Sequence, residues 1–105
     1  MVERRALWYY RLRGYRILAA NAWVAGYELD LVVRRGRRLV FCEVKAKTDD
    51  RFGDPLEMVG EEKQRRLRRA AEAWLGAHPE ADALEVSFDV IAERGGRLER
   101  LAEAF

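Results

Sequence analysis

Apolar and polar positions repeat along the chain with two periods, one typical of helices and one typical of strands. Apolar residues recur every three or four positions in two segments, residues 3–13 and 56–77. Shorter apolar or alternating runs, which favour strands, occupy residues 15–20, 27–33, 38–46, 84–93 and 97–105. Connectors rich in turn-forming residues are expected at 21–26 and 47–55. The pattern predicts the element order αβββαββ.

Two glycine-containing turns set the expected strand directions. Gly36-Arg37 and Gly95-Gly96 each turn a hairpin, so the strands on either side of each turn should be antiparallel. A helix between the third and fourth strands favours a parallel crossover. We therefore expect a single domain over residues 1–105, an α/β protein whose mixed five-stranded sheet carries a helix on each face.

The third predicted strand, LVFCEVKAK at 39–47, carries two charges inside an apolar run. Side chains two positions apart share a face of a strand, so Glu43 and Lys45 continue the face of Leu39 and Phe41. Burying an unpaired charge is costly. The two charges therefore either satisfy each other or serve a site.

The predicted hairpin brings two further carboxylates beside these charges. Its turn places Asp30 opposite Glu43 and Glu28 opposite Lys45, with Cβ atoms about 5 Å apart. Facing carboxylates repel each other, and Mg²⁺, which takes oxygen ligands, would compensate them. Lys45 would then stabilise a phosphate or orient a nucleophilic water. The alternative is a surface on which Glu28 and Lys45 form an ion pair and the other two carboxylates are solvated.

Each predicted helix adds a charged residue to the stripe that should face the sheet. Glu3 lies on the stripe of the first helix. The stripe of the second helix runs through Val59, Lys63, Leu67, Ala70 and Trp74. A helix covers charges only where something compensates them. A shared site would explain Glu3 and Lys63 together with the charges of the hairpin.

Arginine supplies 17 of the 20 basic residues, although the net charge is only +2. Guanidinium groups suit bidentate contacts with phosphate, so the clusters at 34–38 and 65–69 indicate nucleic-acid binding. The candidate contacts are Arg34, Arg35, Arg37, Arg38, Arg65 and Arg69. The alternative is that these arginines only solvate a hairpin and a helix.

Several features argue against a membrane, redox or histidine-metal function. No run reaches the roughly 18 apolar residues of a membrane span, and the charged start MVERRALWYYRLR lacks the apolar region of a signal peptide. We therefore expect a cytoplasmic protein with no membrane partner. Cys42 lies in an apolar strand and should be a buried thiol. His78 is expected to interact with a helix C-terminus rather than with a metal.

Stretches along the whole chain together resemble one protein family. They are ERRA in the first helix, GYRIL with Asn21, ELDLV, LVFCEVKAK, FGDPLEMV with Lys63, SFDVI and LERLAEAF. Over almost all of its length the chain resembles the YraN-type uncharacterised proteins, relatives of the archaeal Holliday junction resolvases. Asp30 on one strand and the run Glu43-Val44-Lys45 on the next also resemble the PD-(D/E)XK nuclease superfamily.

The resemblance implies a three-layer, restriction-endonuclease-like fold with strand order 12345, in which strands two and five are antiparallel to the rest. It implies that Asp30 and Glu43 are metal ligands, that the carbonyl of Val44 is a further ligand, and that Lys45 is the catalytic lysine.

Other positions match the family or depart from it. Glu3 matches an acidic residue that adjoins the site in related resolvases, and Glu28 matches the Glu before the metal-binding Asp. Asp89 matches a family position too, where a hydrogen bond to a turn is expected rather than a direct catalytic role. Tyr27 stands where the family usually has Gly.

These observations favour a metal-dependent endonuclease that uses Mg²⁺, or Mn²⁺ in its place, to hydrolyse DNA phosphodiester bonds, with branched or structured DNA as the candidate substrate. The intact set of Asp30, Glu43 and Lys45 favours an enzyme, because a non-catalytic nucleic-acid-binding module would not need it. A scaffold with purely structural ion pairs is the third alternative. Whether the chain forms a homodimer is left open.

Overall fold

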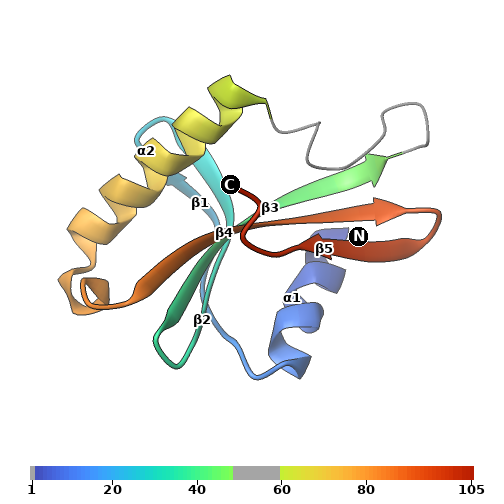
Figure 1. The fold of residues 1–105 in the computed structure, drawn as a ribbon, viewed down its shortest axis with the longest axis horizontal. Helices are drawn as coiled ribbons and strands as arrows, with labels where there is room; N and C mark the ends of the chain where they lie inside the picture. The colour runs from blue at the N-terminus through green and yellow to red at the C-terminus, as the bar shows by residue number, and fades with distance from the viewer. Residues whose placement is uncertain (1, 49–59) are drawn as a thin grey trace.

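The computed structural model describes residues 2–48 and 60–105, in which a five-stranded sheet carries one helix on each face (Figure 1). In chain order the elements are α1 (Val2–Leu12), β1 (Arg16–Val24), β2 (Tyr27–Arg35), β3 (Arg38–Thr48), α2 (Glu61–Ala77), the short 3₁₀ helix η3 (Pro79–Ala81), β4 (Glu85–Arg94) and β5 (Arg97–Leu101). The predicted order of helices and strands is confirmed.

The strands lie side by side in the order in which they occur in the chain, β1-β2-β3-β4-β5. Only β3 and β4 are parallel neighbours among the described strands, while the other three neighbouring pairs are antiparallel. A parallel pair needs a crossover, and α2 lies between β3 and β4 in the chain. The predicted α/β class and mixed sheet are confirmed.

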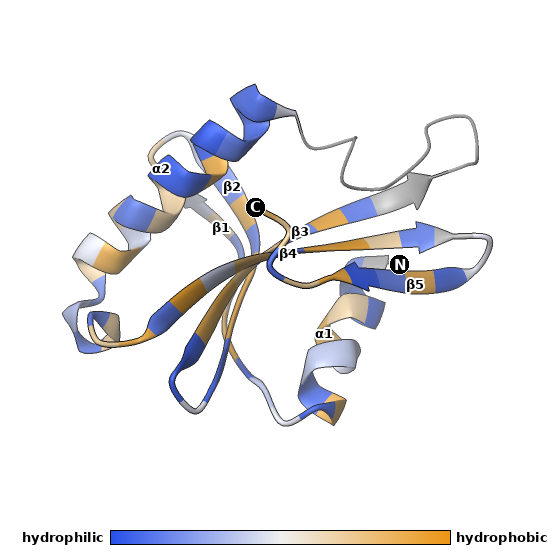
Figure 2. Ribbon diagram, in the orientation of Figure 1, coloured by the Kyte–Doolittle hydropathy of each residue, from blue (hydrophilic) through white to orange (hydrophobic). Residues whose placement is uncertain are grey.

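Each helix covers its own apolar core. On the α2 side, Leu67, Ala70 and Trp74 pack with Leu39 and Phe41 of β3. Figure 2 shows hydrophilic colour along much of α2 and hydrophobic colour in the central parts of the strands. Within the described residues, neither helix is long and apolar enough to cross a membrane.

The core on the α1 side uses the alternate residues of the same strand. Ala6 and Tyr10 of α1 pack with Val40 and Cys42. Cys42 is a buried free thiol, as predicted, and its burial raises the pKa of the thiol. Because β3 sends alternate side chains to opposite faces, Glu43 follows Phe41 and Leu39 to the α2 side of the sheet.

The predicted register of the β2–β3 hairpin is confirmed over its paired residues, which extend as far as Leu31 opposite Cys42. Leu31 belongs to the core on the α1 side, but Leu29 belongs to the core on the α2 side. Residues two apart in a regular strand share a face, so β2 changes face at Asp30.

β1 is longer than predicted. Residues 21–24, which were expected in a connector, continue the strand to Val24. Asn21 has a φ of 51°, yet the pairing with β2 continues beyond it. The turn is confined to Ala25 and Gly26, both with positive φ. The connector predicted for residues 21–24 is wrong because cross-strand pairing carries the backbone through this irregular position.

The start of α2 also differs from the prediction. Gly60 precedes the helix with extended dihedral angles, φ −69° and ψ 172°, and the helix begins at Glu61. A helix that continues from residue 56 through Gly60 is therefore wrong, because an N-cap residue lies outside the helical region of φ and ψ. Residues 56–59, with Val59 of the predicted stripe, lie outside the described residues.

The ends of two other strands need correction. β3 runs to Thr48 and so includes the start of the predicted loop at 47–55, the rest of which lies outside the described residues. β5 ends at Leu101, short of the predicted end at residue 105. Glu103 then adopts a φ of 52°, which takes the backbone out of the extended region.

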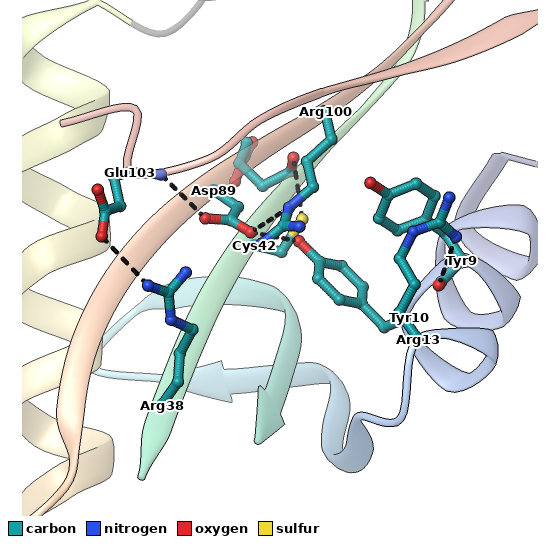
Figure 3. A network of polar contacts seen from close by, with 9 residues as sticks. Tyr9, Tyr10, Arg13, Arg38, Cys42, Asp89, Arg100 and Glu103 are labelled. Atoms are coloured by element: carbon teal, nitrogen blue, oxygen red, sulfur yellow. Dashed lines mark hydrogen bonds and ion pairs between the residues drawn. The ribbon is translucent and has the colours of Figure 1, made fainter. Parts of the chain in front are cut away.

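A buried carboxylate, that of Asp89, ties α1 and the C-terminal segment to the sheet (Figure 3). It accepts hydrogen bonds from the Tyr10 hydroxyl at 2.8 Å, from Nε of Arg100 at 2.8 Å and from the backbone N–H of Glu103 at 3.1 Å. The hydrogen bond from Glu103 confirms the prediction that Asp89 makes a hydrogen bond to a turn. Paired in this way, a fully buried charge is compensated.

Candidate active site

The carboxylate of Glu43 is the centre of a polar cluster beneath α2. Its side chain is only 7% exposed. Nζ of Lys63 lies 3.3 Å and Nζ of Lys45 lies 3.7 Å from the same oxygen, Oε1. The hydroxyl of Tyr27 donates a hydrogen bond to the other oxygen, Oε2, at 3.2 Å. Side chains from β2, β3 and α2 therefore converge on one buried carboxylate.

Asp30 reaches the same region from the point where β2 changes face. Its Oδ2 accepts a hydrogen bond of 2.8 Å from the backbone N–H of Val44. Burial raises the pKa of Asp30 to about 6, the Val44 N–H opposes this rise, and the negative charges of Glu43 and Glu28 add to it. Asp30 is thus a carboxylate whose ionised form is disfavoured by its surroundings.

The two lysines of the cluster differ in how strongly they hold their protons. Burial and the neighbouring positive charge of Lys63 lower the pKa of Lys45, against the attraction of Glu43. Burial alone would lower the pKa of Lys63 as well, but the negative charges of Glu43 and Asp30 raise it. Lys45, which comes from the central strand, is therefore the lysine that gives up its proton more readily.

Tyr27 belongs to the site, although it was not among the candidate site residues predicted from the sequence. The sequence marked it only as a departure from the usual Gly of the family, and its hydroxyl in fact meets Glu43. Burial and the charge of Glu43 raise the pKa of this hydroxyl, which keeps it a hydrogen-bond donor. The signal was present in the alternation of β2, because Tyr27 shares a face with Leu29, which packs beneath α2.

Of the supporting residues, Glu28 lies elsewhere than the predicted hairpin implied, and Glu3 comes from the helix on the other face of the sheet. Tyr27 and Leu29 both face α2, so alternation turns Glu28 to the other face, where it pairs with Trp23 of β1. The carboxylate that meets the ammonium group of Lys45 is Glu43, from the same strand. Glu3 lies on α1, the helix on the face of the sheet opposite α2.

The arginines of the hairpin contact the protein itself. Arg35 donates to the carbonyl of Arg13 at 2.9 Å, and its guanidinium lies 4.7 Å from the centre of the Tyr15 ring. Arg37 donates to the carbonyl of Ala83 at 3.3 Å. Arg34 similarly donates to the carbonyl of Gly36, and Arg38 lies 3.5 Å from a carboxylate oxygen of Glu103. Of these, Arg35 contributes most clearly to the fold.

The arginines of α2 are more exposed. Arg65 and Arg66 both contact the carboxylate of Glu62, at 2.9 and 3.2 Å, and the three side chains are each more than 60% exposed. Arg69 is also exposed. Exposed pairs of this kind add little to stability, so these arginines remain available to an external anion.

His78 interacts with the C-terminal end of α2, as predicted. Its Nδ1 lies 2.8 Å from the carbonyl oxygen of Trp74, and the two rings stack with centroids 3.8 Å apart. Since a carbonyl oxygen can only accept, Nδ1 carries the proton.

The donor set of the cluster fits a hard divalent cation. In the described ranges, no group of three or more His, Cys, Asp and Glu side chains could hold a metal ion. Mg²⁺ needs fewer protein ligands than that, because one or two carboxylates suffice when water and phosphate complete its shell. Asp30 and Glu43 supply two carboxylates, and a bound cation would favour the ionised form of Asp30 against the burial and the repulsion that raise its pKa.

The fold and this cluster define a mixed α/β protein with a carboxylate–lysine site on its central strand. Comparison with known proteins assigns the chain to a family. A family model described as "Uncharacterised protein family UPF0102" matches residues 2–92. The chain belongs to this family, which confirms the YraN-type resemblance.

Individual relatives support the assignment. The chain is 48% identical to a UPF0102 protein of Xanthomonas oryzae pv. oryzae (strain PXO99A) over 82 residues, 78% of this chain and 67% of the relative. It is 42% identical to one of Nitrobacter winogradskyi over 98 residues, 93% of this chain and 81% of the relative. A UPF0102 protein of Shewanella amazonensis is 40% identical over 105 residues, all of this chain and 95% of the relative.

Proposed function

We propose that this protein is a metal-dependent endonuclease that hydrolyses phosphodiester bonds of DNA, with branched or structured DNA as its substrate. The observation that supports the proposal most strongly is the convergence of Asp30, Glu43 and Lys45 under the edge of α2, where Lys63 also reaches Glu43. Burying these charges is costly, and an apolar face would stabilise the sheet more cheaply. A site for a charged substrate explains why they are there.

In this proposal Asp30 and Glu43 hold Mg²⁺, or Mn²⁺ in its place. The N–H of Val44 points toward Asp30, and in an antiparallel pair the carbonyl of a residue faces the same neighbouring strand as its N–H. The Val44 carbonyl is therefore a suitable third oxygen ligand. When bound, the cation would neutralise the scissile phosphate and lower the pKa of a coordinated water.

Lys45 acts on the nucleophile and on the charge of the phosphate. It lies beside Glu43, and its lowered pKa makes exchange of a proton with water easier than for an exposed lysine. Lys63 retains its charge and balances Glu43 while no substrate is bound. Tyr27 fixes the orientation of the Glu43 carboxylate through Oε2. Each residue thus has a separate task, either binding, orienting or transferring a proton.

One observation favours a different function, that of a nucleic-acid-binding module without catalysis. Both oxygens of Glu43 already have partners within the protein, because two ammonium groups meet Oε1 and Tyr27 meets Oε2. A carboxylate compensated in this way can serve as a structural anchor between α2 and the sheet. In that case the arginines would bind DNA and the cluster would leave it intact.

Cleavage assays separate the two functions. The purified protein is incubated with linear, flapped and four-way DNA in Mg²⁺, in Mn²⁺ and in EDTA. Metal-dependent cuts near the branch, abolished in Lys45→Ala while DNA affinity changes little, are expected for the enzyme, because one charge among many adds little affinity but acts on the transition state. Arg97→Ala, on the exposed start of β5, is the matched control for the loss of one positive charge. Intact DNA under every metal condition, with binding retained, would establish the binding module instead.

A further inference from the structure

A groove of about 420 Å³ lies between α1 and β5, on the far face of the sheet from α2. Its basic lining residues are Arg4, Arg5 and Arg13, and its apolar ones include Trp8, Leu12 and Leu98 of β5. The proposed active site uses none of these residues. The groove therefore needs an explanation of its own.

Two apolar residues of the groove, Trp8 and Leu12, are not part of the core. α1 packs on the sheet through Ala6 and Tyr10, which are fully buried. Trp8 is 53% exposed and Leu12 is 77% exposed. These two are four positions apart, so they form one stripe on the surface of the helix. An exposed aromatic and aliphatic stripe of this kind is typical of a binding surface.

Arginine surrounds this stripe, and the groove lining contains no carboxylate among the described residues. The guanidinium of Arg13 lies 3.6 Å from the centre of the Tyr9 ring and donates to the Tyr9 carbonyl at 3.0 Å. Arg5 is tied to Glu93 at 3.3 Å and to the carbonyl of Gly96 at 2.9 Å. The guanidinium groups of Arg5 and Arg13 are thus held in position, with the charge of Arg5 partly balanced by Glu93.

Trp8 combines with these charges to favour one class of ligand. The guanidinium of Arg11 lies 5.5 Å from the centre of the Trp8 ring, which puts a further positive charge beside the indole. An apolar partner would gain nothing from the arginines, and an isolated phosphate would gain nothing from the indole. Unpaired nucleotides offer both a phosphate for the arginines and a base that can stack on an exposed ring. The bases of duplex DNA are already stacked on each other.

We infer that the groove between α1 and β5 binds an unpaired segment of nucleic acid, with a base stacked on Trp8 and phosphates held by Arg4 and Arg13. The inference rests on the proposed function only in the choice of nucleic acid as the ligand. It adds the reason why a flapped substrate, which contains unpaired nucleotides, would be bound more tightly than linear duplex. The groove is distinct from the cluster around Glu43, so binding here does not require cleavage.

The test measures anisotropy of a short labelled oligothymidylate and of a duplex in EDTA, where no metal-dependent cleavage occurs. Trp8→Ala should weaken single-strand binding about tenfold and duplex binding less than about twofold. Trp8→Phe, which keeps an aromatic face, should retain most of the affinity. Trp23→Ala is the matched control, because Trp23 is 72% exposed on β1, outside the groove. Oligothymidylate should also quench tryptophan emission in the wild type but much less in Trp8→Phe.

Further measurements exclude other occupants of the groove. Arg4→Gln should flatten the plot of log affinity against log salt by about 0.7, as expected for one phosphate contact on a single strand. Equal effects of Trp8→Ala and Trp23→Ala would overturn the inference. So would displacement of the DNA by oligoglutamate at equal concentration, which would assign the groove to acidic peptides, or a dimer that Trp8→Ala dissociates. Absence of nuclease activity would leave all of these results standing.

Discussion

The carboxylate of Asp30 accepts a hydrogen bond from the backbone N–H of Val44 at 2.8 Å, where a regular hairpin would place a backbone carbonyl. The side chain of Asp30 thereby replaces a backbone carbonyl of β2 as the hydrogen-bond acceptor for this N–H of β3. This substitution accompanies the change of face between Leu29 and Leu31. Asp30 is fixed beside the strand that carries Glu43, but at the cost of partial burial.

The first prediction concerns the pH dependence of stability in the metal-free protein. The pKa of Asp30 is about 6 in the folded protein against an ordinary value of 3.8, so between these values the folded state keeps a proton that the unfolded chain has released. The contribution of Asp30 to the free energy of unfolding should therefore be largest below about pH 4 and decrease as the pH rises to about 6. Asp30→Asn, which keeps an acceptor for the Val44 N–H, should remove this decrease.

Urea denaturation in EDTA across this pH range measures the effect as the difference between wild type and variant. Asp82→Asn, at an exposed position after η3, is the control for loss of a carboxylate. If the wild type and Asp30→Asn keep a constant difference across this range, the raised pKa is wrong.

The second prediction concerns Tyr27. Tyr27→Phe removes only the hydroxyl that donates to Glu43, so it should lower the free energy of unfolding by about 1 kcal/mol. A double-mutant cycle with Glu43→Leu, which leaves no acceptor for the hydroxyl, measures the coupling by chemical denaturation. Additive effects of the two substitutions would show that the contact contributes nothing. A coupling of the expected size, together with weaker Mn²⁺ binding in Tyr27→Phe, would support the role of Tyr27 in orienting the carboxylate.

The third prediction concerns competition between lysine and metal at Glu43. Mn²⁺ should stabilise the fold, and the double variant Asp30→Asn, Glu43→Gln should abolish the stabilisation. Lys63→Met should instead strengthen Mn²⁺ binding severalfold, because the ammonium group 3.3 Å from Oε1 occupies a ligand oxygen and repels the cation. Titration calorimetry measures whether Mn²⁺ binding is lost in the double variant and strengthened in Lys63→Met. Mn²⁺ binding that survives in the double variant would place the ligands elsewhere.

The alternation of single strands allowed most of the fold and part of the site to be predicted from the sequence. Glu43 and Lys45 could be placed on the face of Leu39 and Phe41 because β3 alternates regularly, and the spacing of α2 placed Lys63 toward the sheet. The β2–β3 register followed from a turn at Gly36. These features depend on local periodicity, which a sequence displays directly.

Irregular backbone limited the remaining predictions. The change of face at Asp30 turns Glu28 away from Lys45, and no periodic pattern reveals it. Residues 21–24 were expected in a connector, although pairing with β2 holds them within β1. The hydrogen bond from Tyr27 to Glu43 joins two strands, and the spacing of residues along one strand does not predict such a contact.

The fourth prediction concerns the buried network of Asp89. Asp89→Asn removes the charge that compensates Arg100, whose side chain is 18% exposed, and it replaces an acceptor of three hydrogen bonds by an amide. We expect a loss of about 3 kcal/mol in the free energy of unfolding. Asp82→Asn serves again as the exposed control. A loss below about 0.5 kcal/mol, the usual size for a surface substitution, would mean that the network does not anchor the C-terminal segment.

The last prediction compares the two arginine clusters as tracks for duplex DNA. Arg38 is five strand positions from Glu43, about 17 Å along β3, whereas Arg65 and Arg69 lie on the helix whose Lys63 contacts Glu43. Phosphates next to the scissile bond should therefore meet the helix, and the hairpin should meet more distant ones. Arg35 is unsuitable for substitution because it contacts Arg13 and the ring of Tyr15.

Two double variants make the comparison at equal change of charge. One, on the helix, combines Arg65→Ala with Arg69→Ala, and the other, on the hairpin, combines Arg37→Ala with Arg38→Ala. Removing one arginine–phosphate pair should flatten the plot of log affinity against log salt by about 0.9 for duplex DNA, so the slope should fall by up to about 1.8 in the helix variant. Anisotropy titrations at several salt concentrations give both slopes. An unchanged slope in the hairpin variant would mean that those arginines only solvate the turn, while an unchanged slope in both would move the duplex away from α2 and the β2–β3 hairpin altogether.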